Sequence, residues 1–384
     1  MVLKRLFRAF ALILLFSSCH SPGEQESGSK PFEGQEPDSV YKPFYATGFS
    51  ISYYDEIKVI KIEDPWDSEE NTDYVIAGPS GTSSQSKPGN FPFVEYPVDN
   101  WSAFSSTQVV FAEKIGVLKT LKTVAESQYI SHPGVNERIE AGEIRDVGPA
   151  NAADVEVLLD SGPAFIFVSP FKDNRYRHLE EAGLTLINDA GYLESSPLGR
   201  AEWFVFFSTF FDREERAIEL FKKLESRYNR IRETVKDKES RPNVLSGTLF
   251  EGTWHLPAGD SYMARLFADA GADYAYKDKE GTGSLSLDFE TVFNDFHDSD
   301  YWVLTVNHPG TFTSSDLKEM DERYSDFYAF ENGQVLVSNT RHSLFFERGI
   351  IEPDVVLKDL AASFYPDEFP EYSPEYFHFL NDRN

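Results

Sequence analysis

The stretch "DREERAIELFKKLESRYNRIRETVKDK", residues 212–238, has the pattern of one long amphipathic helix. Its apolar residues recur in steps of three and four, and no glycine or proline interrupts them. These apolar positions are Ile218, Phe221, Leu224, Tyr228, Ile231 and Val235. We therefore expect residues 213–238 to form a stiff helical connection, which lets the parts on either side rock only slightly against each other.

Short β-branched or aromatic runs alternate with helical patterns on both sides of this helix. Before it, "WSAFSSTQVVFAEKIG" (101–116) reads as a strand and a capped helix, and "PAFIFVSP" (163–170) as a buried strand. After it, "NVLSGTLF" (243–250) and "DYWVLTV" (300–306) enclose a further helical pattern. This alternation predicts an α/β fold with mainly parallel sheets in two lobes.

The lobe boundaries follow from the position of the helix. We expect an N-terminal lobe over residues 41–212 and a C-terminal lobe over 239–384, with a ligand cleft between them. The N-terminal lobe should open with antiparallel strands in "FSISYYDEIKVIKIED", residues 49–64.

The first forty residues have the composition of an export signal and a tether. Basic residues precede a short apolar run that is well below the roughly 20 residues of a membrane span. Small residues then lead to Cys19, the single cysteine of the chain, in a pattern that resembles the lipobox of lipoproteins. We expect a signal peptide over 1–18, lipid attached at Cys19, and a disordered tether over 19–40, because that segment is rich in Gly, Ser, Pro and acid.

The charge balance excludes one class of partner. The chain has 64 acidic and 36 basic residues, a formal net charge of −28. Such a surface repels nucleic acid and anionic lipid. We therefore expect no nucleic-acid partner, and contact with the membrane only through the N-terminal lipid.

The two lobes share a feature at matching places. Glu156 opens a predicted helix that ends near Gly162, and Glu290 opens one that ends near Asp298; a strand follows each helix. A carboxylate near a helix N-terminus is stabilised by the helix dipole, so each glutamate also fits a purely structural role.

Four segments together resemble the periplasmic substrate-binding lipoproteins of ABC importers for ferric siderophores and cobalamin, and the resemblance covers roughly residues 41–375. The segments are "GRAEWFVFFSTFF" (199–211), "EGTWHLPAGDSYMARLFADAGADY" (251–274), "TGSLSLDFETVF" (282–293) and "PDVVLKDLAASFYPDEFP" (353–370). The resemblance implies two α/β lobes joined by a single long helix. It also implies that a glutamate on each lobe docks to arginine pockets of an ABC permease, and Glu156 and Glu290 are at those positions.

Candidate ligand contacts come from the loops expected at the carboxyl ends of the strands, where the cleft of an α/β protein forms. We expect Trp254 to stack on a flat ligand face and Arg341 to meet an anionic chelate, although each residue also fits an ordinary structural role. The full candidate set is Ser106, Thr107, Tyr129, Phe171, Trp254, His308 and Arg341.

No bare-metal site is indicated, because the eight histidines show no H-x-H or H-x₃-H pairing. A siderophore or corrinoid brings its own metal coordination, so we expect neither a cofactor nor metal ligands from the protein.

An esterase is the alternative from another class. "AGDSYM" (258–263) contains a Gly-Asp-Ser triplet, but no Asp-x-x-His partner occurs in the sequence. Ser261 fits better as a helix cap.

The resulting hypothesis is a monomeric, lipid-anchored binding protein of the cell envelope, without enzymatic activity. It captures a ferric siderophore, or alternatively cobalamin, a cobinamide or haem, and delivers it to a permease.

Overall fold

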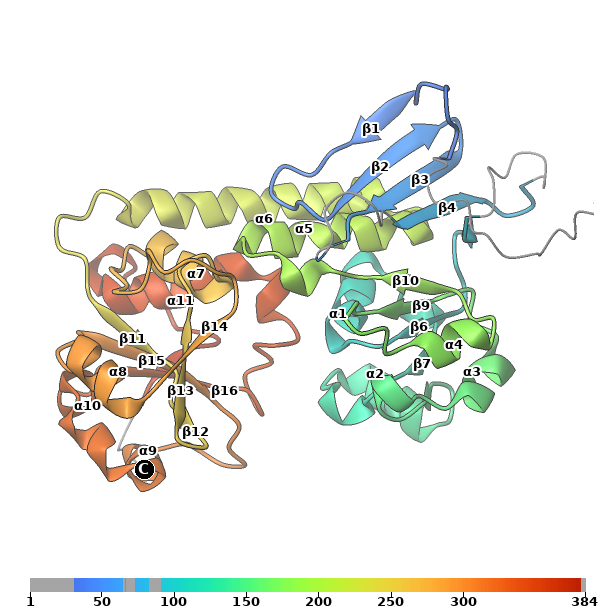
Figure 1. Ribbon diagram of the computed structural model, residues 1–384. Coiled ribbons are helices and arrows are strands. Elements are labelled where there is room, and N and C mark those ends of the chain that lie inside the picture. The colour runs from blue at the N-terminus through green and yellow to red at the C-terminus, as the bar shows by residue number, and fades with distance from the viewer. Residues whose placement is uncertain (1–30, 65, 67–72, 83–90, 381–384) are drawn as a thin grey trace, which may run out of the picture.

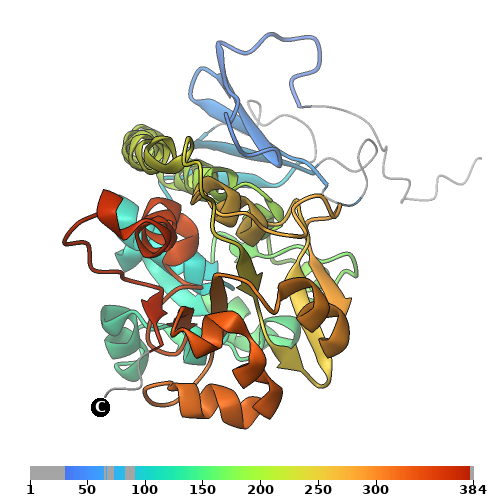
Figure 2. The same cartoon turned by 90° about the vertical axis from the view of Figure 1, so that its left-hand side faces the viewer.

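The computed structural model describes residues 31–64, 66, 73–82 and 91–380. Helix α6 (Glu214–Val235) runs unbroken for 22 residues along both lobes, as predicted (Figure 1). At 1.5 Å per residue it is roughly 33 Å long. Figure 2 shows it nearly end-on, at one edge of the molecule. The two lobes therefore lie side by side and pack against the same continuous helix.

Polar anchors hold α6 to both lobes. At its start, Lys58 Nζ lies 2.6 Å from Glu214 Oε1, and Lys58 comes from strand β3 of the N-terminal lobe. Further along, Arg227 pairs with Asp354 on α11 at 2.6 Å, and the Tyr228 hydroxyl donates to Asp269 at 2.6 Å. These contacts tie the start of α6 to the N-terminal lobe and its second half to the C-terminal lobe.

The N-terminal lobe contains a five-stranded parallel sheet with the order β10-β9-β6-β7-β8. The chain proceeds from β6 outward to β8, then returns to the other side of β6 for β9 and β10. Connections therefore diverge from β6, which creates a crevice at the carboxyl ends of the strands. The strands are β6 (Trp101–Ala103), β7 (Leu121–Val124), β8 (Arg145–Asp146), β9 (Ile166–Val168) and β10 (Leu186–Asn188). The helices are α1 (Ser106–Ile115), α2 (Pro133–Glu140), α3 (Val155–Ser161), α4 (Arg177–Glu181) and α5 (Pro197–Ser208).

The C-terminal lobe also contains a parallel sheet, but its strands follow one another in chain order from one edge to the other. Its main sheet has the order β11-β15-β16-β17, in which only the last pair is antiparallel, and a smaller antiparallel sheet has the order β12-β13-β14. The strands are β11 (Val244–Ser246), β12 (Leu249–Phe250), β13 (Thr253–Pro257), β14 (Ser284–Leu287), β15 (Tyr301–Val306), β16 (Val335–Asn339) and β17 (His378–Phe379). The helices are α7 (Tyr262–Asp269), α8 (Phe289–Phe296), α9 (Ser314–Met320), α10 (Tyr328–Glu331) and α11 (Pro353–Phe364).

A second sheet of the N-terminal lobe contains β1 to β5 in sequence order, and only β4 and β5 are parallel. Two glutamates near the start of α5 hold the chain between β1 and β2. Glu202 accepts hydrogen bonds from the amides of residues 44–46, and Glu194 accepts from those of residues 47 and 48. The strands are β1 (Ser39–Tyr41), β2 (Phe49–Tyr54), β3 (Ile57–Ile62), β4 (Asp73–Pro79) and β5 (Phe93–Tyr96).

The α/β class with two parallel-sheet lobes is confirmed, and the structure adds two details to it. Antiparallel pairing extends over β1–β4 within the five-stranded second sheet and over the separate sheet β12–β14. The expected disorder does not extend to residue 40: the Phe32 ring stacks on Tyr54 at 4.4 Å, and β1 pairs with β2. These aromatic and strand contacts outweigh the polar composition of the segment. Residues 1–30, including the predicted signal peptide and Cys19, lie outside the described part.

Candidate ligand pocket

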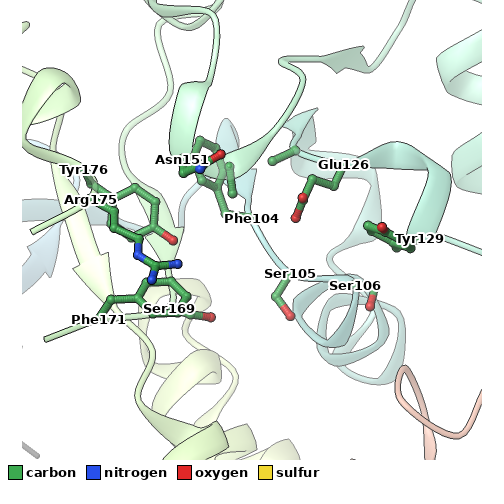
Figure 3. A pocket seen from close by; sticks show the side chains of 12 residues that line it. Phe104, Ser105, Ser106, Glu126, Tyr129, Asn151, Ser169, Phe171, Arg175 and Tyr176 are labelled. Atoms are coloured by element: carbon green, nitrogen blue, oxygen red, sulfur yellow. The ribbon is translucent and has the colours of Figure 1, made fainter. Parts of the chain in front are cut away.

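A pocket of about 410 Å³ lies at the carboxyl ends of the parallel strands in the N-terminal lobe. It occupies the crevice that the divergent connections around β6 create. Figure 3 shows the side chains that line it. The lining residues are Phe104, Ser105, Ser106, Ala125, Glu126, Tyr129, Ala150, Asn151, Ser169, Phe171, Arg175 and Tyr176.

The start of α1 forms one boundary of the pocket, and its hydrogen bonds fix it firmly. Ser105 caps the helix in a reciprocal capping box with Gln108. The Gln108 side chain also accepts from the Phe104 amide at 3.0 Å and donates to Asp189 at 3.1 Å. Ser105 and Ser106 therefore present their side chains from a pre-organised turn (Figure 3).

One side of the pocket is aromatic. The guanidinium of Arg175 lies 4.1 Å from the centre of the Phe171 ring, and its Nε donates to both carboxylate oxygens of Asp173 at 3.1 Å. Tyr176 lies beside Phe171, with 6.3 Å between ring centres. Burial raises the pKa of Tyr176 to about 12, so this phenol remains protonated at neutral pH and can donate a hydrogen bond.

Glu126 and Tyr129 form the opposite side (Figure 3). Glu126 has a left-handed backbone with φ of 53°, which is costly for a residue with a side chain. Its amide donates to the Gly148 carbonyl at 2.9 Å, which holds this conformation. Tyr129 ends the following 3₁₀ turn with 63 % of its surface exposed. A large aromatic ring is thus presented to solvent at the pocket rim.

Three of the predicted ligand residues, Ser106, Tyr129 and Phe171, line this pocket. Thr107 lies on the same first turn of α1 but is not part of the lining.

The structure brings His308 and Arg341 together in the other lobe. They follow β15 and β16, and the Asn339 side chain joins their loops: Oδ1 accepts from the amides of both residues, and Nδ2 donates to the His308 carbonyl at 2.9 Å. Neither residue lines the pocket of the N-terminal lobe.

Trp254 does not fit the predicted role, because its side chain is fully buried in the core of the C-terminal lobe. The indole Nε1 donates to the Ser246 carbonyl at 2.8 Å. The ring stacks with that of Trp302, with 5.8 Å between the ring centres. Trp254 holds the end of β11 in place. The ring is not available to stack on a ligand, and we exclude it from the proposed contacts.

Sequence reasoning missed several lining residues, including Glu126, Asn151, Ser169 and Arg175. Two of them could have been found, since Ser169 directly follows β9 and Glu126 follows β7 by two residues. Asn151 and Arg175 come from connections whose path the sequence does not specify.

The two candidate docking glutamates occupy equivalent positions. Asp154 caps α3 and Asp288 caps α8, and in each case the glutamate is the second residue of the helix. Both glutamates are exposed. Figure 1 shows α3 and α8 on the outer flanks of the two lobes. They differ in one respect: Arg323 lies 3.6 Å from Glu290, whereas no ion pair of Glu156 occurs within the described residues.

Two kinds of feature are absent from the part of the chain that the structure describes. None of the helices there is long and apolar enough to cross a membrane. No group of three or more His, Cys, Asp or Glu side chains there has an arrangement suited to a metal ion.

Residues 105–339 match the family model described as periplasmic binding protein. The chain therefore belongs to the periplasmic binding protein family. Among curated proteins, it is 28 % identical to an uncharacterized lipoprotein of Methanocaldococcus jannaschii. The aligned region of 306 residues covers 77 % of this chain and 72 % of that protein.

Solved structures show the same fold. A periplasmic heme binding protein from Pseudomonas aeruginosa superimposes with a TM-score of 0.57 at 16 % identity, covering 74 % of this chain and 99 % of the other. A protein of an ABC-type Fe³⁺-hydroxamate transport system from Saccharomonospora viridis gives 0.53 at 20 % identity, covering 70 % and 94 %. At these identities the likeness establishes the fold alone.

Proposed function

We propose that this protein is the extracytoplasmic binding component of an ABC importer, which captures a ferric siderophore and delivers it to the permease without chemical change. The observation that carries the proposal is the pocket at the carboxyl ends of the N-terminal sheet, which has aromatic residues on two sides. The loops with His308 and Arg341 extend from the corresponding strand ends of the C-terminal sheet.

The chemistry of the pocket suits a bound chelate. Tyr129, Phe171 and Tyr176 offer apolar ring surface, while the serine hydroxyls and the Asn151 amide offer hydrogen bonds. Structural relatives with heme or Fe³⁺-hydroxamate in their descriptions support a ligand that brings its own metal coordination. Cobalamin, a cobinamide and haem are the alternatives in the same class.

The position of Ser261 does not suit covalent catalysis. Ser261 of the Gly-Asp-Ser triplet is buried, and its Oγ accepts from the Ala264 amide at 3.3 Å as the cap of α7. The family is one of binding proteins, in agreement with this role.

The proposed function also includes docking to the permease and anchoring to the membrane. Glu156 and Glu290 would present one carboxylate per lobe to arginine pockets of the permease, because charge-assisted contacts at two separated points fix orientation and speed encounter. Lipid at Cys19 would hold the protein at the membrane surface. The lipoprotein relative from Methanocaldococcus jannaschii supports this anchor.

The test is native mass spectrometry of the protein purified from its own host, combined with fluorescence titration of ligand-free protein. We expect a co-purifying iron chelate and saturable binding of ferric siderophores. A co-purifying cobalt corrinoid or haem would select an alternative ligand. If no chelate of these three classes binds, the proposed function is wrong.

A further inference from the structure

The pocket wall carries one negative and one positive side chain, and the two differ in their bonding partners. Of the 12 lining residues, only Glu126 and Arg175 carry a formal charge, and they lie on opposite sides (Figure 3). The charge of the preferred ligand therefore depends on which of these two side chains is free to contact it.

Arg175 is already neutralised within its own loop. Its Nε donates to both carboxylate oxygens of Asp173 at 3.1 Å, and its guanidinium covers the Phe171 ring at 4.1 Å. An anionic ligand would have to compete with Asp173 for this guanidinium.

Glu126 has no comparable partner. Within the described residues its carboxylate forms no ion pair or hydrogen bond, although the residue is half-buried in the pocket wall. Asp146 is not a lining residue, but it accepts from the amide of Ser127, the residue after Glu126, at 3.3 Å, which places a second negative charge close to this part of the chain. The formal charge of the whole chain, −28, acts in the same direction.

The exposed Tyr129 ring shares this side of the pocket with Glu126. A carboxylate beside an accessible aromatic face is an arrangement that binds cations, through direct charge attraction and cation–π contact. We infer that the protein prefers a chelate with a positive charge, such as a ferric hydroxamate bearing an ammonium group, whose cationic end lies against Glu126 and Tyr129. This inference rests on the proposed function. The predicted ligand charge is opposite to that of the anionic chelate expected from Arg341 alone.

The sharpest test uses two ferric trihydroxamates that differ in one group. Ferrioxamine B carries a terminal ammonium, and its N-acetylated form is neutral but otherwise the same. We expect the full-length protein to bind the ammonium form about tenfold more tightly at low salt, with a smaller ratio at high salt. In Glu126→Gln the ratio should approach one, mainly through weaker binding of the ammonium form. Glu140→Gln on α2, an exposed site outside the lining with the same change of charge, should keep the wild-type ratio.

The outcomes separate this inference from the proposed function. Equal affinity for the two hydroxamates, or tighter binding of an anionic ferric tris-catecholate or of haem, would overturn the charge preference and leave chelate binding intact. A preference that persists unchanged in Glu126→Gln would overturn the role of this carboxylate. If neither hydroxamate, nor the tris-catecholate, haem or cobinamide binds, the proposed function fails and this inference fails with it.

Discussion

The backbone amide of Ser131, in the N-terminal lobe, donates a 3.0 Å hydrogen bond to Oε2 of Glu347, in the C-terminal lobe. A second bridge lies nearby, where Lys114 on α1 pairs with Glu352 at the start of α11. The Tyr376 hydroxyl donates to the same carboxylate at 2.7 Å. Both bridges come from the segment after β16, so the lobes are connected by polar contacts as well as by α6.

We predict that Glu347→Ala widens the range of lobe separations with little loss of stability. Glu347 is buried, and one hydrogen bond to it contributes about 1 kcal/mol, whereas α6 and its packing are untouched. Spin labels at positions 122 and 319, in a Cys19→Ser background, would measure the distribution of distances by double electron–electron resonance. Glu331→Ala, an exposed site on α10, is the control. An unchanged distribution would show that this bond does not restrain the lobes.

The Arg227–Asp354 pair between α6 and α11 should make stability depend on pH. Asp354 is buried, and burial raises its pKa above the ordinary value even though Arg227 lowers it. A raised pKa in the folded state means that Asp354 stabilises the fold most at pH values below its unfolded pKa, and that this contribution is lost as pH rises through the folded pKa.

We therefore predict that Arg227→Gln raises the pKa of Asp354 further and destabilises the protein more at neutral than at acid pH. The expected loss at neutral pH is about 1–2 kcal/mol, because Arg227 is half exposed and solvent screens the pair. Urea unfolding at several pH values measures it. In an Asp354→Asn background the pH dependence of the Arg227→Gln effect should disappear; if it remains, another group is responsible.

Trp254 and Tyr129 should separate stability from binding. Trp254→Phe removes the hydrogen bond to Ser246 and leaves a gap beside Trp302, so we expect a loss of about 2–3 kcal/mol in unfolding free energy and unchanged ligand affinity.

Tyr129→Ala changes an exposed ring at the pocket rim, so it should weaken ligand binding with little effect on stability. Denaturant unfolding and fluorescence titration of both variants would check this pair. Weaker binding in Trp254→Phe alone would contradict the assignment.

We predict that the double variant Glu156→Gln with Glu290→Gln abolishes transport and leaves ligand affinity unchanged. Both carboxylates are exposed on the outer flanks of the lobes, away from the pocket lining. Uptake of labelled chelate by cells that carry the variant, with titration of the purified protein, separates the two effects. The matched control is Glu140→Gln with Glu319→Gln, which removes the same charge from exposed sites on α2 and α9. Reduced affinity in the docking variant would place these acids in the ligand site instead.

Local patterns in the sequence were enough to predict α6, the capped start of α1 and the matching helix starts at Glu156 and Glu290. These features depend on residues three or four positions apart, whose spacing on a helix is fixed by backbone geometry. The α/β class followed in the same way, because alternating strands and helices have few ways to bury their apolar faces.

The composition of the pocket was decided by the tertiary structure. Glu126 and Arg175 lie 49 positions apart in the printed sequence, and only the divergence of connections around β6 places them on opposite sides of one cavity. Burial of Trp254 was equally hidden, because Trp254 lies within strand β13, and the exposure of a strand residue depends on which elements pack over its face of the sheet. A sequence determines what each segment can form, whereas the surroundings of a side chain depend on contacts between segments that share no local pattern.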